Sequence, residues 1–333
     1  MKKLLLTIAP NWLGDVVMAT PAFRVLKQRF PEHTLIAAAQ KSGCELLSGL
    51  PWIDEFLTLP AKPRLADMRR AAVALPQRPD IAVVLPHSLR AALFARLSGA
   101  RQRVGYDRGG RRCLLTKAIP PYQEGGKIVP IYMLDEYLGL ARALGAEDDA
   151  RGPELAVAES DLAAVRVHLT ERRKIVALAP GAAFGPSKRW PAECFAAVAD
   201  ALAERHGAAC VLLTGPGEED TRAAVLAAAK HPLIDVQGPA PSVGKLKAAI
   251  ASADLLIGND SGPRHIAVAL QRPVICLMGP TSPRYTAGPY ERGKVLRVDV
   301  PCGPCQRPVC TTDHRCMTAL TVDQVVDAAL NWM

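Results

Sequence analysis

An aspartate stands where the first apolar run of the sequence gives way to a helical pattern. Asp15 ends the segment Pro10–Asp15, which follows the apolar run Leu4–Ala9 and contains Gly14, a residue that permits a tight turn. Aspartate is a preferred N-cap residue, so Asp15 can simply cap the helix. A carboxylate at the end of a strand can instead accept the proton of an attacking hydroxyl, as a general base does. The residues of this segment leave both interpretations open.

A lysine lies within a loop of small residues in the second half of the chain. The segment Ala179–Pro191 follows an apolar run and contains Lys188. Small residues let backbone amides approach a phosphate, and Lys188 supplies a point charge. The segment lacks the Gly-Lys-Ser/Thr pattern of a P-loop, which argues against a P-loop kinase or ATPase. A solvated basic turn is the alternative interpretation.

Two further loops carry polar groups after predicted strands. In the first loop we expect the amides of Ser261 and Gly262 to hold a diphosphate, with Asp260 orienting the loop or a ligand hydroxyl. His265 is either part of this site or a packed histidine. In the second loop an acidic residue, Glu219 or its neighbour Glu218, is placed to accept hydrogen bonds from ribose hydroxyls. Acidic residues also favour helix starts, so this second signal is weak.

The elements around these loops alternate between strand and helix. Strands are predicted at Leu4–Ala9, Leu35–Ala39, Phe56–Leu59, Ile81–Leu85, Ile175–Ala179, Ala209–Thr214, Leu233–Val236, Leu255–Gly258 and Val274–Met278. Helices are predicted at Asp15–Phe30, Leu65–Leu75, Asp161–Arg173, Ala192–His206, Asp220–Lys230, Val243–Ser252, Ile266–Leu270 and Val322–Asn331. The strands are apolar without alternation, which is typical of parallel sheets covered by helices on both faces.

The length of 333 residues favours two domains. A step at Gly152-Pro153 interrupts the alternation, and we place the boundary so that the domains span residues 1–157 and 158–333. The predicted fold class is α/β, with two doubly wound Rossmann-like domains facing a central cleft in which ligands bind.

Charge and hydropathy limit the kinds of partner that we expect the protein to bind. Forty-one Lys and Arg against 32 Asp and Glu give a net charge of +9, which favours anionic partners. The basic residues are dispersed and only 5% of residues are aromatic, which argues against nucleic acid. The apolar start of the chain is broken at Pro10, and no run is long enough to cross a bilayer. We therefore expect a soluble cytoplasmic protein.

The motifs and their order resemble the bacterial lipopolysaccharide heptosyltransferases of glycosyltransferase family 9, particularly the heptosyltransferase II group. The resemblance runs over nearly the whole chain, through the four segments Trp12–Asp15, Pro180–Pro191, Asn259–Gly262 and Gly279–Pro283. The second of these segments is the most specific. In the related first heptosyltransferase two adjacent threonines assist the phosphates, and Ala183 and Phe184 stand at the matching places. Lys188 and the backbone amides must then provide more of the binding of the phosphates.

The resemblance implies the two-sheet fold called GT-B, with the donor bound mainly by the second domain. The implied reaction is inverting and needs no metal or other cofactor. Heptose would pass from ADP-L-glycero-β-D-manno-heptose to the first heptose of the lipopolysaccharide inner core, on a lipid A–Kdo–heptose acceptor. Asp15 would then be the catalytic base and Lys188 the diphosphate partner, while Glu219 would bind the ribose. Asp260, Ser261, Gly262 and His265 would form the donor loop.

Other functions remain as alternatives. These are another heptosyltransferase step of the same pathway, a two-sheet nucleotide-sugar epimerase, and a non-catalytic protein that binds anionic glycolipid. A nicotinamide dehydrogenase would carry a Gly-x-Gly-x-x-Gly turn after a strand, and none follows Leu4–Ala9 or Ile175–Ala179. We also expect peripheral binding to the cytoplasmic face of the inner membrane through basic residues such as Arg101, Arg108 and Arg111.

Nine cysteines are present, and four of them lie close together near the C-terminus. These are Cys302, Cys305, Cys310 and Cys316, in a spacing that suits a structural zinc or iron–sulfur site. A thiol-rich loop near the acceptor site and a pair of disulfides formed on isolation are the alternatives. The transferase interpretation does not depend on the choice.

Overall fold

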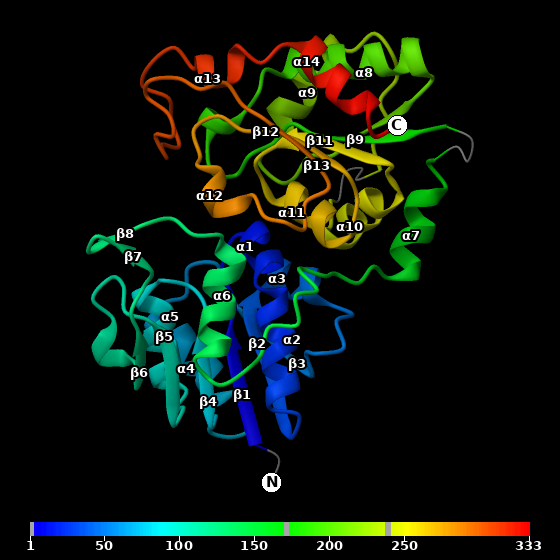
Figure 1. Ribbon diagram of the computed structural model, residues 1–333. Helices are drawn as coiled ribbons and strands as arrows, with labels where there is room; N and C mark the ends of the chain where they lie inside the picture. The colour runs from blue at the N-terminus through cyan, green and yellow to red at the C-terminus, as the bar shows by residue number, and fades with distance from the viewer. Residues whose placement is uncertain (1–2, 170–172, 237–240) are drawn as a thin grey trace. The chain divides into compact units, whose positions relative to one another are not determined.

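The computed structural model describes residues 3–169, 173–236 and 241–333. The chain divides into two compact units, Met1–Ala156 and Val157–Met333. This division differs by one residue from the predicted boundary. Each unit is a parallel β-sheet covered by helices, so the α/β expectation is confirmed (Figure 1). No helix of the described residues is both long and apolar enough to cross a membrane.

The first unit is built on a six-stranded parallel sheet in the order β3-β2-β1-β4-β5-β6. Its strands are β1 (Lys3–Ile8), β2 (His33–Gln40), β3 (Glu55–Leu59), β4 (Ile81–Val84), β5 (Gln102–Tyr106) and β6 (Lys117–Ile119), with a hairpin of β7 (Gln123–Glu124) and β8 (Lys127–Ile128). Its helices are α1 (Leu13–Met18), α2 (Thr20–Arg29), α3 (Lys41–Leu47), α4 (Leu65–Val73), α5 (Leu89–Leu97) and α6 (Met133–Arg142), and a 3-10 turn η1 spans Arg112–Leu114. This strand order places a topological switch point between β1 and β4, where ligands of doubly wound sheets bind.

The single helix predicted over Asp15–Phe30 is two helices, which meet at Ala19. Pro21 lies in the first turn of α2 and cannot donate a backbone hydrogen bond. Thr20 Oγ1 donates to Val17 O at 2.8 Å and accepts from the amide of Glu154 at 3.0 Å. A contact with a distant segment therefore stabilises the break, which the local apolar pattern does not reveal.

The second unit is built on a five-stranded parallel sheet in the order β10-β9-β11-β12-β13. Its strands are β9 (Ile175–Ala179), β10 (Ala209–Leu212), β11 (Leu255–Asn259), β12 (Val274–Leu277) and β13 (Gly293–Leu296). Its helices are α7 (Glu159–Arg166), α8 (Ala192–His206), α9 (Glu219–Ala228), α10 (Val243–Ser252), α11 (Gly262–Ala269), α12 (Pro283–Thr286), α13 (Arg315–Thr318) and α14 (Val322–Leu330), with a 3-10 turn η2 at Pro186–Lys188. Here the topological switch point lies between β9 and β11.

Two predicted elements of the second unit differ from the structure. The strand expected at Leu233–Val236 is a single bridge, in which Ile234 pairs with Val211. The helix expected at Asp161–Arg173 begins at Glu159 and ends at Arg166, and residues 170–172 lie outside the described residues. Short apolar stretches at a sheet edge carry too little signal to distinguish a strand from one bridging residue.

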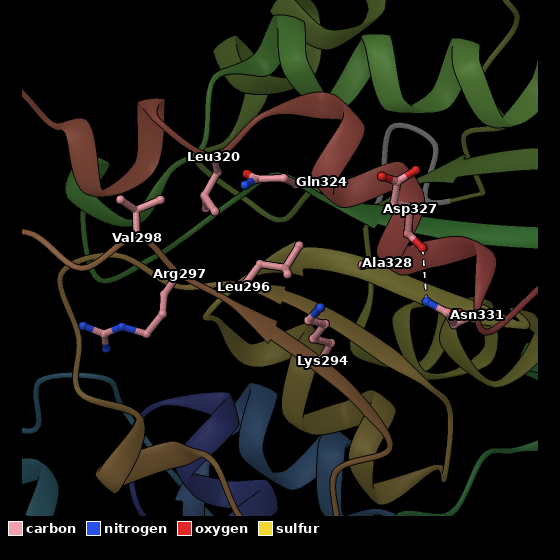
Figure 2. A pocket seen from close by; sticks show the side chains of 9 residues that line it. All are labelled: Lys294, Leu296, Arg297, Val298, Leu320, Gln324, Asp327, Ala328 and Asn331. Carbon is pink, nitrogen blue, oxygen red and sulfur yellow. Dashed lines mark hydrogen bonds between the residues drawn. The ribbon is translucent and has the colours of Figure 1, made fainter.

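A cavity of about 320 Å3 lies between the edge strand β13 and helix α14. Leu296 and Leu320 line it together with polar groups such as Lys294 and Gln324 (Figure 2). Asn331 at the end of α14 donates to Asp327 O at 3.2 Å. None of the predicted site residues lines this cavity, so we do not assign the donor to it.

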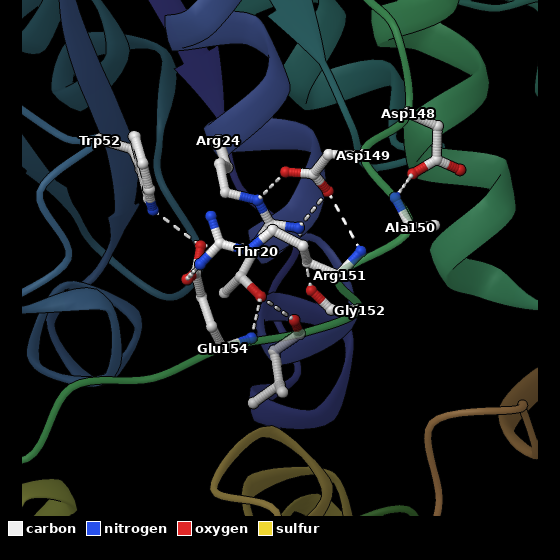
Figure 3. Close-up of polar contacts among 10 residues, drawn as sticks. Thr20, Arg24, Trp52, Asp148, Asp149, Ala150, Arg151, Gly152 and Glu154 are labelled. Carbon is white, nitrogen blue, oxygen red and sulfur yellow. Dashed lines mark hydrogen bonds and ion pairs between the residues drawn. The ribbon is translucent and has the colours of Figure 1, made fainter.

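A buried arginine fastens the segment that ends the first unit (Figure 3). Arg24 of α2 is fully buried and pairs with Asp149 at 2.7 Å and with Glu154 at 2.6 Å. The same Glu154 carboxylate accepts from Trp52 Nε1 at 2.7 Å, and Arg24 also donates to Gly152 O at 3.1 Å. These bonds satisfy a buried charge and hold the chain just before the boundary at Ala156.

Candidate active site

One buried asparagine joins two of the predicted motifs at the switch point of the second unit. Asn259, the last residue of β11, donates from Nδ2 to Pro180 O at 2.7 Å. Its Oδ1 accepts from the amide of Trp190 at 3.1 Å. Pro180 and Trp190 lie at the two ends of the loop that follows β9. The structure therefore brings the loops after β9 and β11 together, as the position of a doubly wound ligand site requires.

An ion pair connects the same two loops. Lys188 Nζ lies 2.7 Å from Asp260 Oδ2 and 2.9 Å from Asp260 O. Oδ2 of Asp260 also accepts from Thr281 Oγ1 at 2.7 Å, and Oδ1 accepts from Arg264 at 2.7 Å. Arg264 is itself fully buried and bonds Glu291 through Nε at 2.9 Å and through a terminal nitrogen at 2.6 Å. The Asp260 carboxylate is thus shared by two cations.

The charges in this network keep Asp260 ionised. Burial alone would raise the pKa of Asp260, but the positive charges of Lys188 and Arg264 hold this pKa far below its usual range. Burial alone would likewise lower the pKa of Arg264, but Glu291 and Asp260 hold it above its usual value. Asp260 is therefore a fixed anion that orients Lys188.

Lys188 retains a donor for a ligand. An ammonium group carries three N–H donors, and Lys188 gives two hydrogen bonds to Asp260. Its Nζ also lies 5.1 Å from the centre of the Phe184 ring, within the range of a cation–π contact. Phe184 thus packs its ring against the lysine and has no hydroxyl to offer a phosphate.

The predicted diphosphate loop opens helix α11. Ser261 is the N-cap residue, but its side chain accepts no hydrogen bond from the helix, and Gly262 is the first helical residue. The partial positive charge of a helix start favours a bound anion there. His265 is buried, and desolvation with the nearby charge of Arg264 lowers its pKa to about 3. His265 is therefore a neutral packed residue beside the loop.

The structure distinguishes the two candidate ribose partners by position. The Glu218 carboxylate accepts from the amide of Gly215 at 2.8 Å and lies against the backbone of Gly181. A Cβ at Gly181 would come within 2.0 Å of the Glu218 carboxylate oxygens. Glu219 is exposed and accepts from the amide of Gly217 at 3.1 Å in its own turn. Glu218, not Glu219, contacts the loop that follows β9.

Asp15 is the one predicted site residue of the first unit. Trp12 is the N-cap residue of α1 and Asp15 is the third residue of that helix, so Asp15 does not occupy the N-cap position that one of its two interpretations gave it. Asp15 is half-buried at the carboxyl end of β1, at the switch point of this sheet. Burial and then the charge of Asp15 raise the pKa of Tyr137 on α6, which places the Tyr137 ring near this carboxylate.

Comparisons with known proteins identify the family of the chain. The model of glycosyltransferase family 9 (heptosyltransferase) matches residues 68–315. The chain belongs to glycosyltransferase family 9. It is 28% identical to lipooligosaccharide heptosyltransferase 2 of Haemophilus ducreyi over an alignment of 314 residues, and the match covers 88% of this chain and 88% of that one.

Solved structures of the family show the same fold. The structure of Escherichia coli ADP-heptose lps heptosyltransferase II is 26% identical with a TM-score of 0.82, and the match covers 99% of this chain and 98% of that one. A family 9 protein of Veillonella parvula matches with a TM-score of 0.88 at 24% identity, over 99% and 97% of the two chains. The predicted GT-B class is confirmed by these neighbours.

A polar cluster of this glycosyltransferase lies at the carboxyl ends of β4 and β5, and the sequence patterns did not reveal it. The buried Glu136 carboxylate lies 3.0 Å from His87 Nε2 and 3.2 Å from Arg108. His87 follows β4 beside the switch point, and that position was the available signal. Arg111 is fully buried and donates to Tyr106 O at 2.9 Å, so the prediction that it contacts a membrane is wrong.

Proposed function

We propose that this glycosyltransferase moves heptose from ADP-L-glycero-β-D-manno-heptose to the first heptose of the lipopolysaccharide inner core, with inversion at the anomeric carbon. Its relatives in Haemophilus ducreyi and Escherichia coli are named heptosyltransferase 2 and II, and the latter is named for ADP-heptose and lps. Family membership favours transfer over the alternative of an epimerase. A different heptosyltransferase step of the same pathway remains the second candidate.

The observation that carries the proposal is the convergence of Lys188 and the start of α11 at the β9/β11 switch point. A nucleotide diphosphate needs a cation and backbone amides, and both are present here. Asp260 fixes the lysine so that little reorganisation accompanies binding. We place the ribose against Glu218, because its carboxylate lies beside Gly181 in the same loop region.

The reaction requires a deprotonated hydroxyl to attack the anomeric carbon while ADP leaves from the opposite face. Asp15 takes the proton from the acceptor hydroxyl, which forms the new C–O bond as the C–O bond to the diphosphate breaks. The free N–H of Lys188 and the amides at Ser261 and Gly262 stabilise the negative charge that develops on the leaving diphosphate. A contribution of about 3 kcal/mol from one such donor is typical.

In this proposal the first unit binds the acceptor. The acceptor is an anionic glycolipid, and the half-buried Arg108, held by the buried Glu136 carboxylate, offers guanidinium donors at the carboxyl edge of that sheet. Peripheral association with the inner membrane follows from the same chemistry through exposed residues such as Arg101 and Arg112. High salt should then release the protein from anionic vesicles.

A transfer assay tests the proposal. The protein is incubated without added divalent cation with ADP-heptose and a lipopolysaccharide acceptor that ends after its first heptose, and ADP release and acceptor mass are followed. We expect a gain of one heptose. Asp15→Asn should lower turnover by about 100- to 10,000-fold with ADP affinity unchanged. Asp67→Asn is the matched control, because Asp67 is the third residue of α4 as Asp15 is of α1.

The outcomes separate the candidates. Transfer to an acceptor that carries no heptose, or only to a longer core, assigns another step of the pathway. Conversion of ADP-heptose to a stereoisomer without acceptor gain supports the epimerase alternative. Full activity of Asp15→Asn would contradict the base assigned here while leaving the donor site standing.

A further inference from the structure

Four thiols of the second unit line one cavity. Cys302, Cys305, Cys310 and Cys316 all border a cavity of about 300 Å3, and each is a free thiol in the structure. Two of them converge on one hydroxyl, since Thr312 Oγ1 lies 4.0 Å from Cys302 Sγ and 3.4 Å from Cys310 Sγ. The transferase mechanism uses none of these groups. These four thiols lie within 15 residues of the chain, and we looked for a separate function for the cavity that they line.

Sulfur ligands and a metal ion complement each other in such a cavity. A coordinating thiol is deprotonated outright, and the positive charge of the ion offsets the repulsion among the thiolates that it binds.

The residue types point to a soft metal held by sulfur. Two residues separate Cys302 from Cys305, and Cys310 and Cys316 follow, a spacing that suits tetrahedral sites made of four cysteines. The other candidate ligands of the cavity are already engaged. His314 Nε2 donates to Ser187 O at 2.7 Å, and Asp313 pairs with Arg315. The four cysteine thiolates then remain as ligands. Among the common divalent ions that do not change oxidation state, zinc is the one that sulfur ligands favour.

The segment has the freedom to close around an ion. Among the described residues, no three His, Cys, Asp or Glu side chains already stand at metal-binding distances. Residues 297–314 are all described and contain no helix or strand, so no helix or sheet within this segment has to break for the thiols to move together. Coupling of metal binding to local ordering is the usual behaviour of small thiolate sites.

This segment braces the turn that presents Lys188. Ser187 is buried and makes three hydrogen bonds to it: Oγ donates to Arg307 O at 2.6 Å, its amide donates to Pro308 O at 3.1 Å, and its carbonyl accepts from His314. Gly185 lies so close that a Cβ there would come within 2.3 Å of Pro308 O. An ordered segment from Cys302 to Cys316 therefore holds Ser187, the residue before Lys188, in place.

We propose that Cys302, Cys305, Cys310 and Cys316 bind one Zn²⁺ ion, and that this ion fixes the segment that positions Lys188. The role is structural, because the site lies outside the donor loops that touch the diphosphate. The proposal does not need the transfer reaction to be the one named above.

Metal content is the primary test. The full chain is purified under reducing conditions without chelator, and bound metals are measured by mass spectrometry of the elements. We expect about one zinc per chain, released by a mercurial reagent in the same amount. Cys302→Ser/Cys305→Ser should retain less than about a tenth of this zinc, because loss of two of four ligands abolishes tight binding. Cys113→Ser, which removes an exposed thiol of the first unit, should keep all of it.

Several results would overturn the assignment. Absence of metal from the reduced wild-type protein, with failure to take up added zinc, would exclude the site. Disulfides among these four cysteines in the reduced, folded protein would assign them to cross-linking. One iron per chain in place of zinc would refute the choice of ion.

The second arm tests the link to Lys188. ADP affinity is measured by calorimetry for the zinc-loaded protein, the zinc-depleted protein and the depleted protein reloaded with zinc. We expect depletion to weaken ADP binding about tenfold and reloading to restore it. An unchanged ADP affinity would refute the bracing role while the metal content stands. Failure of the zinc-loaded protein to bind ADP would instead contradict the proposed donor site, so the two proposals fail separately.

Discussion

The ammonium of Lys188 lies 2.7 Å from the carboxylate of Asp260, although 72 positions separate the two residues in the sequence. The pair is nearly buried, with 12% of the lysine side chain and 2% of the aspartate side chain exposed. Asp260 therefore holds a cation at the switch point of the second sheet, between the loop after β9 and the helix that follows β11. This preorganisation is the basis on which we assign the donor site.

Removal of the lysine should weaken donor binding and slow transfer. We expect Lys188→Ala to reduce ADP affinity about tenfold and turnover by about 100-fold, because the charge-assisted bond to the diphosphate strengthens as negative charge develops. The matched control is Lys174→Ala in the same unit, where Lys174 lies 3.5 Å from Asp254 and is 53% exposed. Calorimetry and the ADP-release assay measure the two effects. Equal behaviour of both variants would contradict the assignment.

The two adjacent glutamates should differ sharply. Glu218→Gln should weaken ADP binding about tenfold, the effect of one hydrogen bond of roughly 1.4 kcal/mol to a charged group. Glu219→Gln, at an exposed position, should change it less than about twofold. A cycle with 2′-deoxy-ADP sharpens the result, because the wild-type protein should lose affinity for it and Glu218→Gln should not. If only Glu219→Gln lost ADP affinity, the result would support Glu219 as the ribose partner, as predicted from the sequence.

His265 should make the protein sensitive to acid. Its pKa is lowered from 6.5 to about 3 by burial and by the charge of Arg264. Between these values the unfolded chain binds a proton that the folded protein does not, so stability falls as the pH drops from about 6.5, by up to roughly 1.4 kcal/mol per pH unit. His265→Gln should flatten this dependence.

Urea unfolding midpoints at several pH values between about 7 and 4 measure this effect. The control is His206→Gln, which changes an exposed histidine at the end of α8. It should retain the wild-type slope. A slope that His265→Gln leaves unchanged would show that other groups set the acid sensitivity.

Arg24, which binds the segment at the end of the first unit, should matter for stability. Arg24→Ala leaves Asp149 and Glu154 without their buried partner, and both carboxylates are partly exposed, at 21% and 24%. We expect a loss of about 2 to 3 kcal/mol in the free energy of unfolding, less than for a fully buried pair. Arg151→Ala removes an exposed partner 3.8 Å from Glu154 and should cost less than about 0.5 kcal/mol. Equal losses in thermal or urea unfolding would contradict the role given to Arg24.

The sequence by itself determined the strand–loop–helix units and their class. The strand Ile175–Ala179 and the helices Ala192–His206 and Val243–Ser252 have the predicted bounds, because apolar periodicity and chain-breaking residues act over a few neighbouring positions. The resemblance of whole motifs likewise identified the family, which the family model confirms. These features depend on neighbouring residues or on the order of the motifs along the chain.

Only the tertiary structure decided which side chains meet. Thr20 stabilises the break between α1 and α2 through the amide of Glu154, a contact that no local pattern encodes. The choice between Glu218 and Glu219 depends on how one loop packs against Gly181, and adjacent residues on a turn point in different directions. The ion pair of Lys188 with Asp260 arises because parallel strands end at the same edge of a sheet, whatever their separation along the chain.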